Sequence, residues 1–253
     1  MGGQTEGLMV MAVIGGGFAI GNIVFTVMSW ISRIFFPMIW KYPYPEIPGP
    51  EYDNPKYTNN DKGTTVLMAG SFNPPHKGHT EMIEYLSKRY QKVVVVVGHN
   101  PDKTYEVTPE QRVQLLESCF KNEEKVSVTS TSDYIWRHVP EAKIFFRGIR
   151  SWEKDGADEK KLAILNTWGP LSLGPFWWPR ETFFLQGNPA YSHVSSTMIR
   201  DFCKEQAAKD STATSTTTTK RGGKGKVKDP IKEFVPEIIA AKVKDLYSKS
   251  KSD

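Results

Sequence analysis

The chain has 253 residues, of which 39% are hydrophobic and 24% are charged, and its formal net charge is +5. These averages exclude collagen-like, disulfide-rich and wholly disordered proteins, and the length suits one domain with appendages. The two cysteines, Cys119 and Cys203, are too few for a disulfide framework or a cysteine-built zinc site. We therefore expect buried, unreactive thiols and a reducing or redox-neutral compartment.

The N-terminal part of the chain is strongly apolar. From Gly7 to Ser32 no side chain is ionisable, a run of about 26 residues, whereas about 20 apolar residues can cross a bilayer as a helix. A secretory signal peptide is the weaker interpretation, because Glu6 is the only charge before the run and a basic start is missing. Residues 1–41 are therefore predicted to be a membrane anchor, with a helix at about 8–32 and an interfacial aromatic segment after it.

The charges that flank this segment predict its orientation. Arg33 and Lys41 both lie on its C-terminal side. Because basic residues favour the inner side of a membrane, we expect a single-pass protein in a lipid bilayer, with its globular part on the cytoplasmic or matrix side. Among the membranes that fit, the mitochondrial inner membrane is our preferred location.

The remainder of the chain divides by composition. Residues 42–61 are rich in proline, which predicts an extended linker, and a globular domain is predicted over 62–206. The segment 207–229 is rich in Ser, Thr, Gly and Lys and carries four of the five net positive charges, which predicts a flexible, solvated insertion. Contact with anionic lipid or nucleic acid is the alternative for this segment, and no nucleic-acid partner is expected. A closing C-terminal helix is predicted within 230–253, begun by Pro236.

Strand and helix patterns alternate through the globular domain. Helical spacing of apolar residues predicts helices that begin near Gly78 and Thr108, one at about 157–167, and one after Ser195. Single helices between strands predict an α/β fold with a doubly wound parallel sheet. Short β-branched runs predict its strands at 64–70, 92–98, 125–131, 143–148 and 182–186.

The segment that leaves the first of these strands carries the main candidate chemistry. In a doubly wound sheet, ligands bind at the carboxyl ends of strands, next to helix N-termini that offer N–H groups to phosphate. The segment GSFNPPHKGH places His76 and His79 three residues apart at the start of a helix, with Gly78 between them. Two imidazoles there suit a phosphate whose charge grows during substitution, and two surface histidines in a turn are the alternative. Neither a P-loop nor a GxGxxG motif is present.

Two motifs in this order resemble the signatures of the nucleotidylyltransferase superfamily. The segment NPPHKGH at 73–79 resembles its (H/T)xGH element, and VSSTMIR at 194–200 resembles its ISSTxIR element. Over about 64–206 and the closing helix, the chain is most similar to phosphopantetheine adenylyltransferases. Three further segments resemble motifs of that family: GHNPDKTYEVTPEQRVQLL, FFRGIR and EKKLAILN. Nicotinamide mononucleotide adenylyltransferase is the alternative, because GSFNPP and VSSTMIR fit that family as well.

The resemblance implies a Rossmann-like nucleotidylyltransferase fold and an activity. The implied reaction transfers AMP from ATP to 4′-phosphopantetheine, giving dephospho-coenzyme A and pyrophosphate, with Mg²⁺ arriving on ATP and no metal site built by the protein. His76, His79 and Lys103 would contact the reacting phosphates. Helix capping is an equal explanation for Ser195. The other implied substrate- and nucleotide-binding residues are Ser71, Phe72, Arg147, Gly148, Arg150, Glu159, Ser195, Ser196 and Thr197.

Three features depart from that family's pattern. They are the membrane anchor, the basic insertion, and a stretch at 167–181 that is longer and more aromatic. These additions keep a hypothesis of another class open, because fold alone does not determine function. The domain would then be an accessory subunit of a membrane complex, for example a respiratory one, with little or no activity and with the other subunits as partners.

Overall fold

The computed structural model divides into two units, Met1–Met38 and Ile39–Asp253. It describes residues 23–24, 27, 39–41, 64–98, 105–142, 144–151, 153–156, 159, 161–162, 165–166, 169, 173, 181–213 and 229–248.

The predicted membrane helix lies almost entirely outside these residues. In the first unit, Ile23, Val24 and Val27 are helical and exposed. Within the residues that the structure describes, no helix is long and apolar enough to cross a membrane. The linker at 42–61 lies outside the described residues as well, so both remain predictions from sequence.

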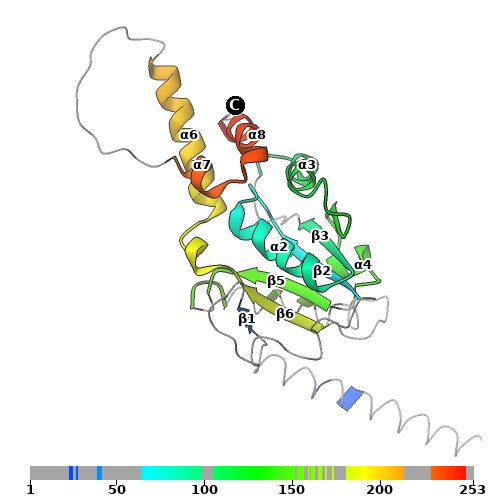
Figure 1. Ribbon diagram of the computed structural model, residues 1–253. Helices are drawn as coiled ribbons and strands as arrows, with labels where there is room; N and C mark the ends of the chain where they lie inside the picture. The colour runs from blue at the N-terminus through cyan, green and yellow to red at the C-terminus, as the bar shows by residue number, and fades with distance from the viewer. Residues whose placement is uncertain are drawn as a thin grey trace, which may run out of the picture. The chain divides into compact units, whose positions relative to one another are not determined.

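A parallel six-stranded sheet forms the centre of the second unit, in the order β1-β6-β5-β2-β3-β4 (Figure 1). Each predicted strand is present within one residue of its predicted ends, which confirms the parallel α/β fold. Valines 93–97 are all buried. The hydrophobicity of this strand is continuous rather than alternating because both faces of the sheet are covered. The strands are β1 (Ile39–Lys41), β2 (Thr65–Gly70), β3 (Lys92–Gly98), β4 (Val126–Thr131), β5 (Ile144–Ile149) and β6 (Glu181–Gln186).

Strand β1 was not predicted. It pairs in parallel with β6 at the sheet edge, with Ile39 opposite Phe184 and Lys41 opposite Gln186. These residues belong to the range 1–41 that we assigned to the anchor and its interfacial segment, and the structure takes them into the sheet instead. Three residues are too short for a strand pattern, and their state depends on backbone pairing with a strand far away in the sequence.

Helices cover both faces of the sheet. On one face, α2 (Lys77–Arg89) and α3 (Pro109–Cys119) pack on a cluster that includes Val95, Phe146 and Leu185. On the other, α4 (Ile135–His138) lies beside Leu67 and Phe145. Residues 153–156, 159, 161–162, 165–166 and 169 are helical, which agrees with the helix expected at about 157–167 where the structure describes it.

The C-terminal helices form a separate core with α3. Helix α6 (Ser196–Ala213), α7 (Pro230–Phe234) and α8 (Glu237–Ser248) pack together, with α8 also against α3 (Figure 1). Helix α6 continues to Ala213, so the first residues of the predicted insertion 207–229 are helical, because Ala207 and Ala208 favour helix. Helix α8 begins directly after Pro236 as expected, whereas the separate α7 was not predicted.

Both cysteines are free thiols that burial makes unreactive. Cys203 is buried in the C-terminal core, and Cys119 is partly buried at the end of α3. Burial raises the pKa of the Cys119 thiol to about 12 and that of Cys203 to about 11. Since the thiolate is the reactive form, both side chains are inert near neutral pH, as predicted.

The packing of Gly169 against Trp136 gives a testable prediction. An alanine Cβ at Gly169 would overlap the buried indole ring of Trp136. Gly169→Ala should therefore lower the free energy of unfolding by about 1–3 kcal/mol, although alanine favours helix by itself. Gly98→Ala is the control, because its Cβ would meet its nearest neighbour at 3.9 Å. Equal urea-unfolding curves for the two variants would contradict this packing.

Candidate active site

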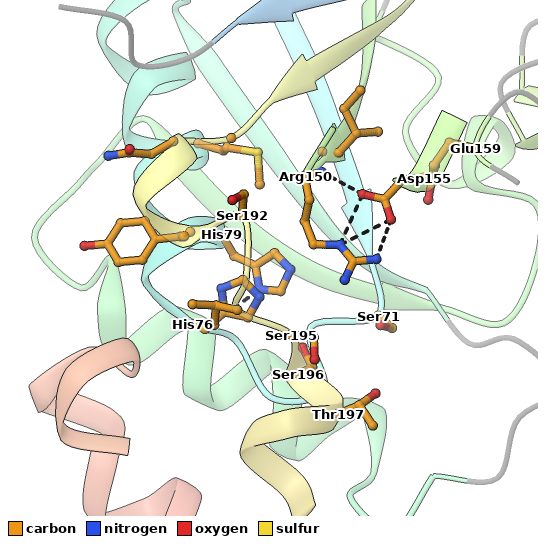
Figure 2. Close-up of a pocket in the computed structure, with 18 residues that line it drawn as sticks. Ser71, His76, His79, Arg150, Asp155, Glu159, Ser192, Ser195, Ser196 and Thr197 are labelled. Carbon is orange, nitrogen blue, oxygen red and sulfur yellow. Dashed lines mark hydrogen bonds and ion pairs between the residues drawn. The ribbon is translucent and has the colours of Figure 1, made fainter. Parts of the chain in front are cut away.

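The cavity of interest lies at the carboxyl ends of β2 and β5, where the strand order reverses. Chain connections leave β2 and β5 in opposite directions there, which is the usual ligand site of a doubly wound sheet. The cavity measures about 390 Å³ and is bounded by the segment after β2, the end of β5 and the start of α6 (Figure 2). The predicted residues that line it are Ser71, His76, His79, Gly148, Arg150, Glu159, Ser195, Ser196 and Thr197.

The segment between β2 and α2 has an unusual backbone. Phe72 has a φ of 45°, in the left-handed region that non-glycine residues rarely adopt, and the Asn73–Pro74 peptide bond is cis. The Phe72 ring is buried beneath His79, edge to face, with the two ring centres 5.1 Å apart. Phe72 is not among the described residues that line the cavity, and its ring packs under His79, so its predicted substrate contact stays a prediction.

His76 and His79 form a stacked pair at the start of α2. Their ring centres lie 3.7 Å apart, and the backbone N–H of His76 donates to Nδ1 of His79 at 3.3 Å. Because Nδ1 of His79 accepts, the neutral ring carries its proton on Nε2. Gly78 leaves the space that this pair needs, since a Cβ there would lie 3.2 Å from the His76 ring.

The two imidazoles are uncharged near neutral pH. Burial, and then the positive charge of Arg150, lower the pKa of His76 to about 4. Burial, and then repulsion by a protonated His76, lower the pKa of His79 well below its ordinary value. Both side chains therefore act as neutral hydrogen-bonding groups. A bound phosphate would favour their protonation, because an opposite charge raises the pKa of a histidine.

Arg150 lines the cavity and is held by Asp155. Its Nη2 donates to Oδ1 of Asp155 at 2.5 Å, its Nε contacts both carboxylate oxygens, and its backbone N–H also reaches Asp155 (Figure 2). Burial alone would raise the pKa of Asp155, but the hydrogen bonds from Arg150 outweigh it and lower that pKa. The Arg150 side chain is 43% exposed, so its guanidinium remains open to an anion.

Arg147 is placed differently from what we predicted. Its Nε and Nη2 donate to the two carboxylate oxygens of Glu159 at 2.5 and 2.7 Å, and its Nη1 donates to the carbonyl of Ala69 at 3.0 Å. Arg147 is not among the described residues that line the cavity, whereas Glu159 is. The Arg147 guanidinium is thus directed to the Glu159 carboxylate and to the end of β2.

The second signature supplies the N-terminus of α6 to the cavity. Ser195 Oγ accepts from the backbone N–H of Met198 at 3.1 Å, so Ser195 caps the helix. Ser196 Oγ donates to the carbonyl of Pro74 at 2.8 Å, which joins the two signatures directly. Thr197 is exposed at the cavity, and its Oγ1 accepts from Arg200. Two helix N-termini, those of α2 and α6, therefore face the same space.

Lys103 lies outside the described residues, so its predicted phosphate contact stays a prediction. Sequence reasoning missed three residues that line the cavity, Asp155, Asn188 and Tyr191. Asn188 Nδ2 donates to Glu81 at 3.2 Å, and Glu81 also interacts with Tyr191. The turn signal Gly187-Asn188-Pro189 directly after β6 could have indicated this part of the lining.

The described part of the chain contains no cluster of three or more His, Cys, Asp or Glu side chains that could hold a metal ion. The two carboxylates of the cavity, Asp155 and Glu159, are both engaged by arginines. Oxygen donors for a hard cation such as Mg²⁺ would therefore come mainly from the phosphates of a ligand and from water.

The depressed pKa of His76 predicts a pH effect on stability. The unfolded chain binds a proton near pH 6.5 and the folded chain near pH 4, so the free energy of unfolding should fall by up to about 3 kcal/mol as the pH drops between these values. His76→Asn keeps a good helix cap and should reduce this fall. Urea unfolding at several pH values measures this fall in the free energy of unfolding. The control is His138→Asn, at an exposed position on α4. An unchanged fall in His76→Asn would contradict the buried neutral imidazole.

Comparison with known proteins supports the two signatures. The chain is 29% identical over 175 residues to a phosphopantetheine adenylyltransferase of Alkaliphilus metalliredigens (strain QYMF), covering 68% of this chain and 92% of that protein. A candidate nicotinate-nucleotide adenylyltransferase from Vibrio parahaemolyticus superposes with a TM-score of 0.41 at 16% identity, covering 74% of this chain and 96% of that one.

A bifunctional NMN adenylyltransferase/ADP ribose pyrophosphatase from Francisella tularensis, solved with AMP and a manganese ion, also has a TM-score of 0.41 and 16% identity, over 73% of this chain and 50% of that one. The family model described as cytidylyltransferase-like matches residues 67–202, which is more than half of the chain and includes both signatures. The chain therefore belongs to the cytidylyltransferase-like family of nucleotidyltransferases.

Proposed function

We propose that the protein is an adenylyltransferase that transfers AMP from ATP to 4′-phosphopantetheine, giving dephospho-coenzyme A and pyrophosphate. The observation that carries the proposal is the cavity in which the His76–His79 pair and the N-terminus of α6 face one another. The similarity to a phosphopantetheine adenylyltransferase along 92% of that protein's length supports the choice of acceptor.

The geometry suits stabilisation of a triphosphate. The N-termini of α2 and α6 present the positive ends of two helix dipoles to the cavity, where phosphate oxygens would bind. His79 is partly exposed, lines the cavity and carries an Nε2–H donor. A hydrogen bond from this neutral donor strengthens as negative charge grows on the phosphate, so it stabilises the transition state more than the ground state.

Arg150 is the described cation best placed for a phosphate. Its guanidinium is partly exposed at the cavity, and Asp155 fixes its orientation before a ligand arrives. A guanidinium can bind phosphate oxygens through two parallel N–H groups. The acceptor phosphate is already an anion near neutral pH, so positioning for in-line attack on the α-phosphate matters more than a general base. Magnesium would neutralise the phosphates of ATP, held mainly by their own oxygens.

An acceptor assay tests the proposal. The full chain, purified in mild detergent, should release pyrophosphate from Mg·ATP when 4′-phosphopantetheine is added. Release with nicotinamide mononucleotide instead would replace the acceptor and keep the adenylyltransferase class. Release with neither would remove the enzymatic proposal and favour the accessory-subunit hypothesis, which extraction of the native protein in a large assembly would support.

Substitution of His79 tests the role of the histidine pair. His79→Ala should lower kcat on the order of 10²-fold or more, because it removes the donor aimed at the reacting phosphates. His138→Ala, at an exposed position on α4, should leave the rate unchanged. The measurement is steady-state pyrophosphate release at saturating ATP and acceptor. A His79→Ala enzyme with the rate of the parent chain would exclude this mechanism.

A further inference from the structure

The segment between β2 and α2 receives a hydrogen bond from the end of the chain. The Tyr247 hydroxyl, on the last turn of α8, donates to Oδ1 of Asn73 at 2.6 Å. Tyr247 is 0% exposed and Asn73 is 6% exposed. The bond therefore lies in a dry environment, where a hydrogen bond has its greatest effect on geometry. Burial raises the pKa of the Tyr247 hydroxyl, so this group stays protonated and remains a donor.

The Asn73 backbone is held at the same time from another helix. Arg200 Nη1, on α6, donates to the Asn73 carbonyl at 2.5 Å. The side chain of Asn73 is thus fixed by α8 and its carbonyl by α6. Asn73 directly follows Phe72, whose left-handed backbone lies beneath His79. A change at Asn73 would therefore reach the histidine pair through Phe72, whose ring contacts the His79 ring.

Helix α7 makes a second contact with this part of the site. Lys77, the first residue of α2, donates from Nζ to the carbonyl of Glu233 at 2.7 Å. This lysine stands between the two signature histidines in the sequence, yet it is not among the cavity-lining residues that the structure describes. Its ammonium group is used to join α7 to the start of α2. Helix α8 thus contacts the chain before His76, at Asn73, and helix α7 contacts it after His76, at Lys77.

We propose that Tyr247 is a positioning residue for the His76–His79 pair, and that α7 and α8 set the geometry of the active site from the C-terminal end of the chain. The inference rests on the proposed function for its kinetic consequence only. Without the hydroxyl of Tyr247, Oδ1 of Asn73 would be a buried acceptor with no donor, and the segment 71–76 would shift to satisfy it. A displacement of the imidazoles by a fraction of an ångström would then slow the chemical step.

Tyr247→Phe is the decisive variant, because the phenyl ring preserves the packing of α8 while the hydroxyl is removed. We expect kcat for pyrophosphate release to fall about tenfold or more with little change in the KM for ATP. The double variant Tyr247→Phe/Asn73→Ala should be no slower than Asn73→Ala alone, since residues that act as a pair are non-additive. Tyr134→Phe, an exposed tyrosine before α4, is the matched control and should keep the parent rate.

A second measurement needs no substrate and separates this inference from the proposed function. Hydrogen–deuterium exchange of the peptide that covers 71–79 should be faster in Tyr247→Phe than in the parent chain and in Tyr134→Phe. If the parent chain shows no transferase activity but the exchange difference is present, the proposed function fails and the positioning role stands. If Tyr247→Phe has the parent kcat, or loses only thermal stability with unchanged exchange at 71–79, the positioning role is excluded.

Discussion

Residues 71–76 hold a backbone that their own sequence does not stabilise, and the rest of the active site depends on it. Side chains from other elements donate to this segment: Arg112 of α3 to the Ser71 carbonyl at 2.6 Å, Ser196 and Arg200 of α6, and Tyr247 of α8. These donors satisfy backbone and side-chain acceptors that a buried loop would otherwise leave unpaired. The histidine pair can stack only because this support keeps Phe72 below it.

Arg112 supports this segment from a buried position, which is unusual for a cation. Its guanidinium is 0% exposed, lies 4.4 Å from the centre of the Tyr105 ring, and donates to Ser71. Burying a cation is unfavourable unless hydrogen bonds or an aromatic face compensate for the lost water. Helices α3, α6 and α8 pack together through apolar side chains, and the core that they form lies close enough to exclude water from Arg112.

Charge in the cavity is arranged before any ligand arrives. Both arginines at the end of β5 are paired with carboxylates, and burial keeps both histidines neutral. This pairing, together with the neutral histidines, limits repulsion among the cations around the site. An incoming phosphate would compete with Asp155 for Arg150 and would favour protonation of the imidazoles. Affinity for phosphate thus comes from a few oriented groups, and the net charge of the chain says nothing about it.

The residues that lie together at the cavity could largely be predicted from the sequence, whereas the direction and partner of each side chain could not. The histidines, Ser71, Arg150 and the three residues of the second signature all line the cavity as the motifs implied. The motifs did not indicate that Arg147 pairs with Glu159 or that Phe72 lies in the core, and the predicted ligand contacts of both residues stay predictions. A motif records which residue types recur at a position, whereas the direction of a side chain depends on its neighbours in space.

The sequence by itself determined the five main strands, the start of α2 and α3, and the meeting of two signatures at one edge of a parallel sheet. These follow from periodicity and capping among residues close together in the chain, where local sterics and hydrogen bonds decide. Only the tertiary structure decided the pairing of β1 with β6, the role of Asp155, and the bond between Tyr247 and Asn73, which are 174 residues apart. Such contacts leave no local pattern, because folding alone brings their partners together.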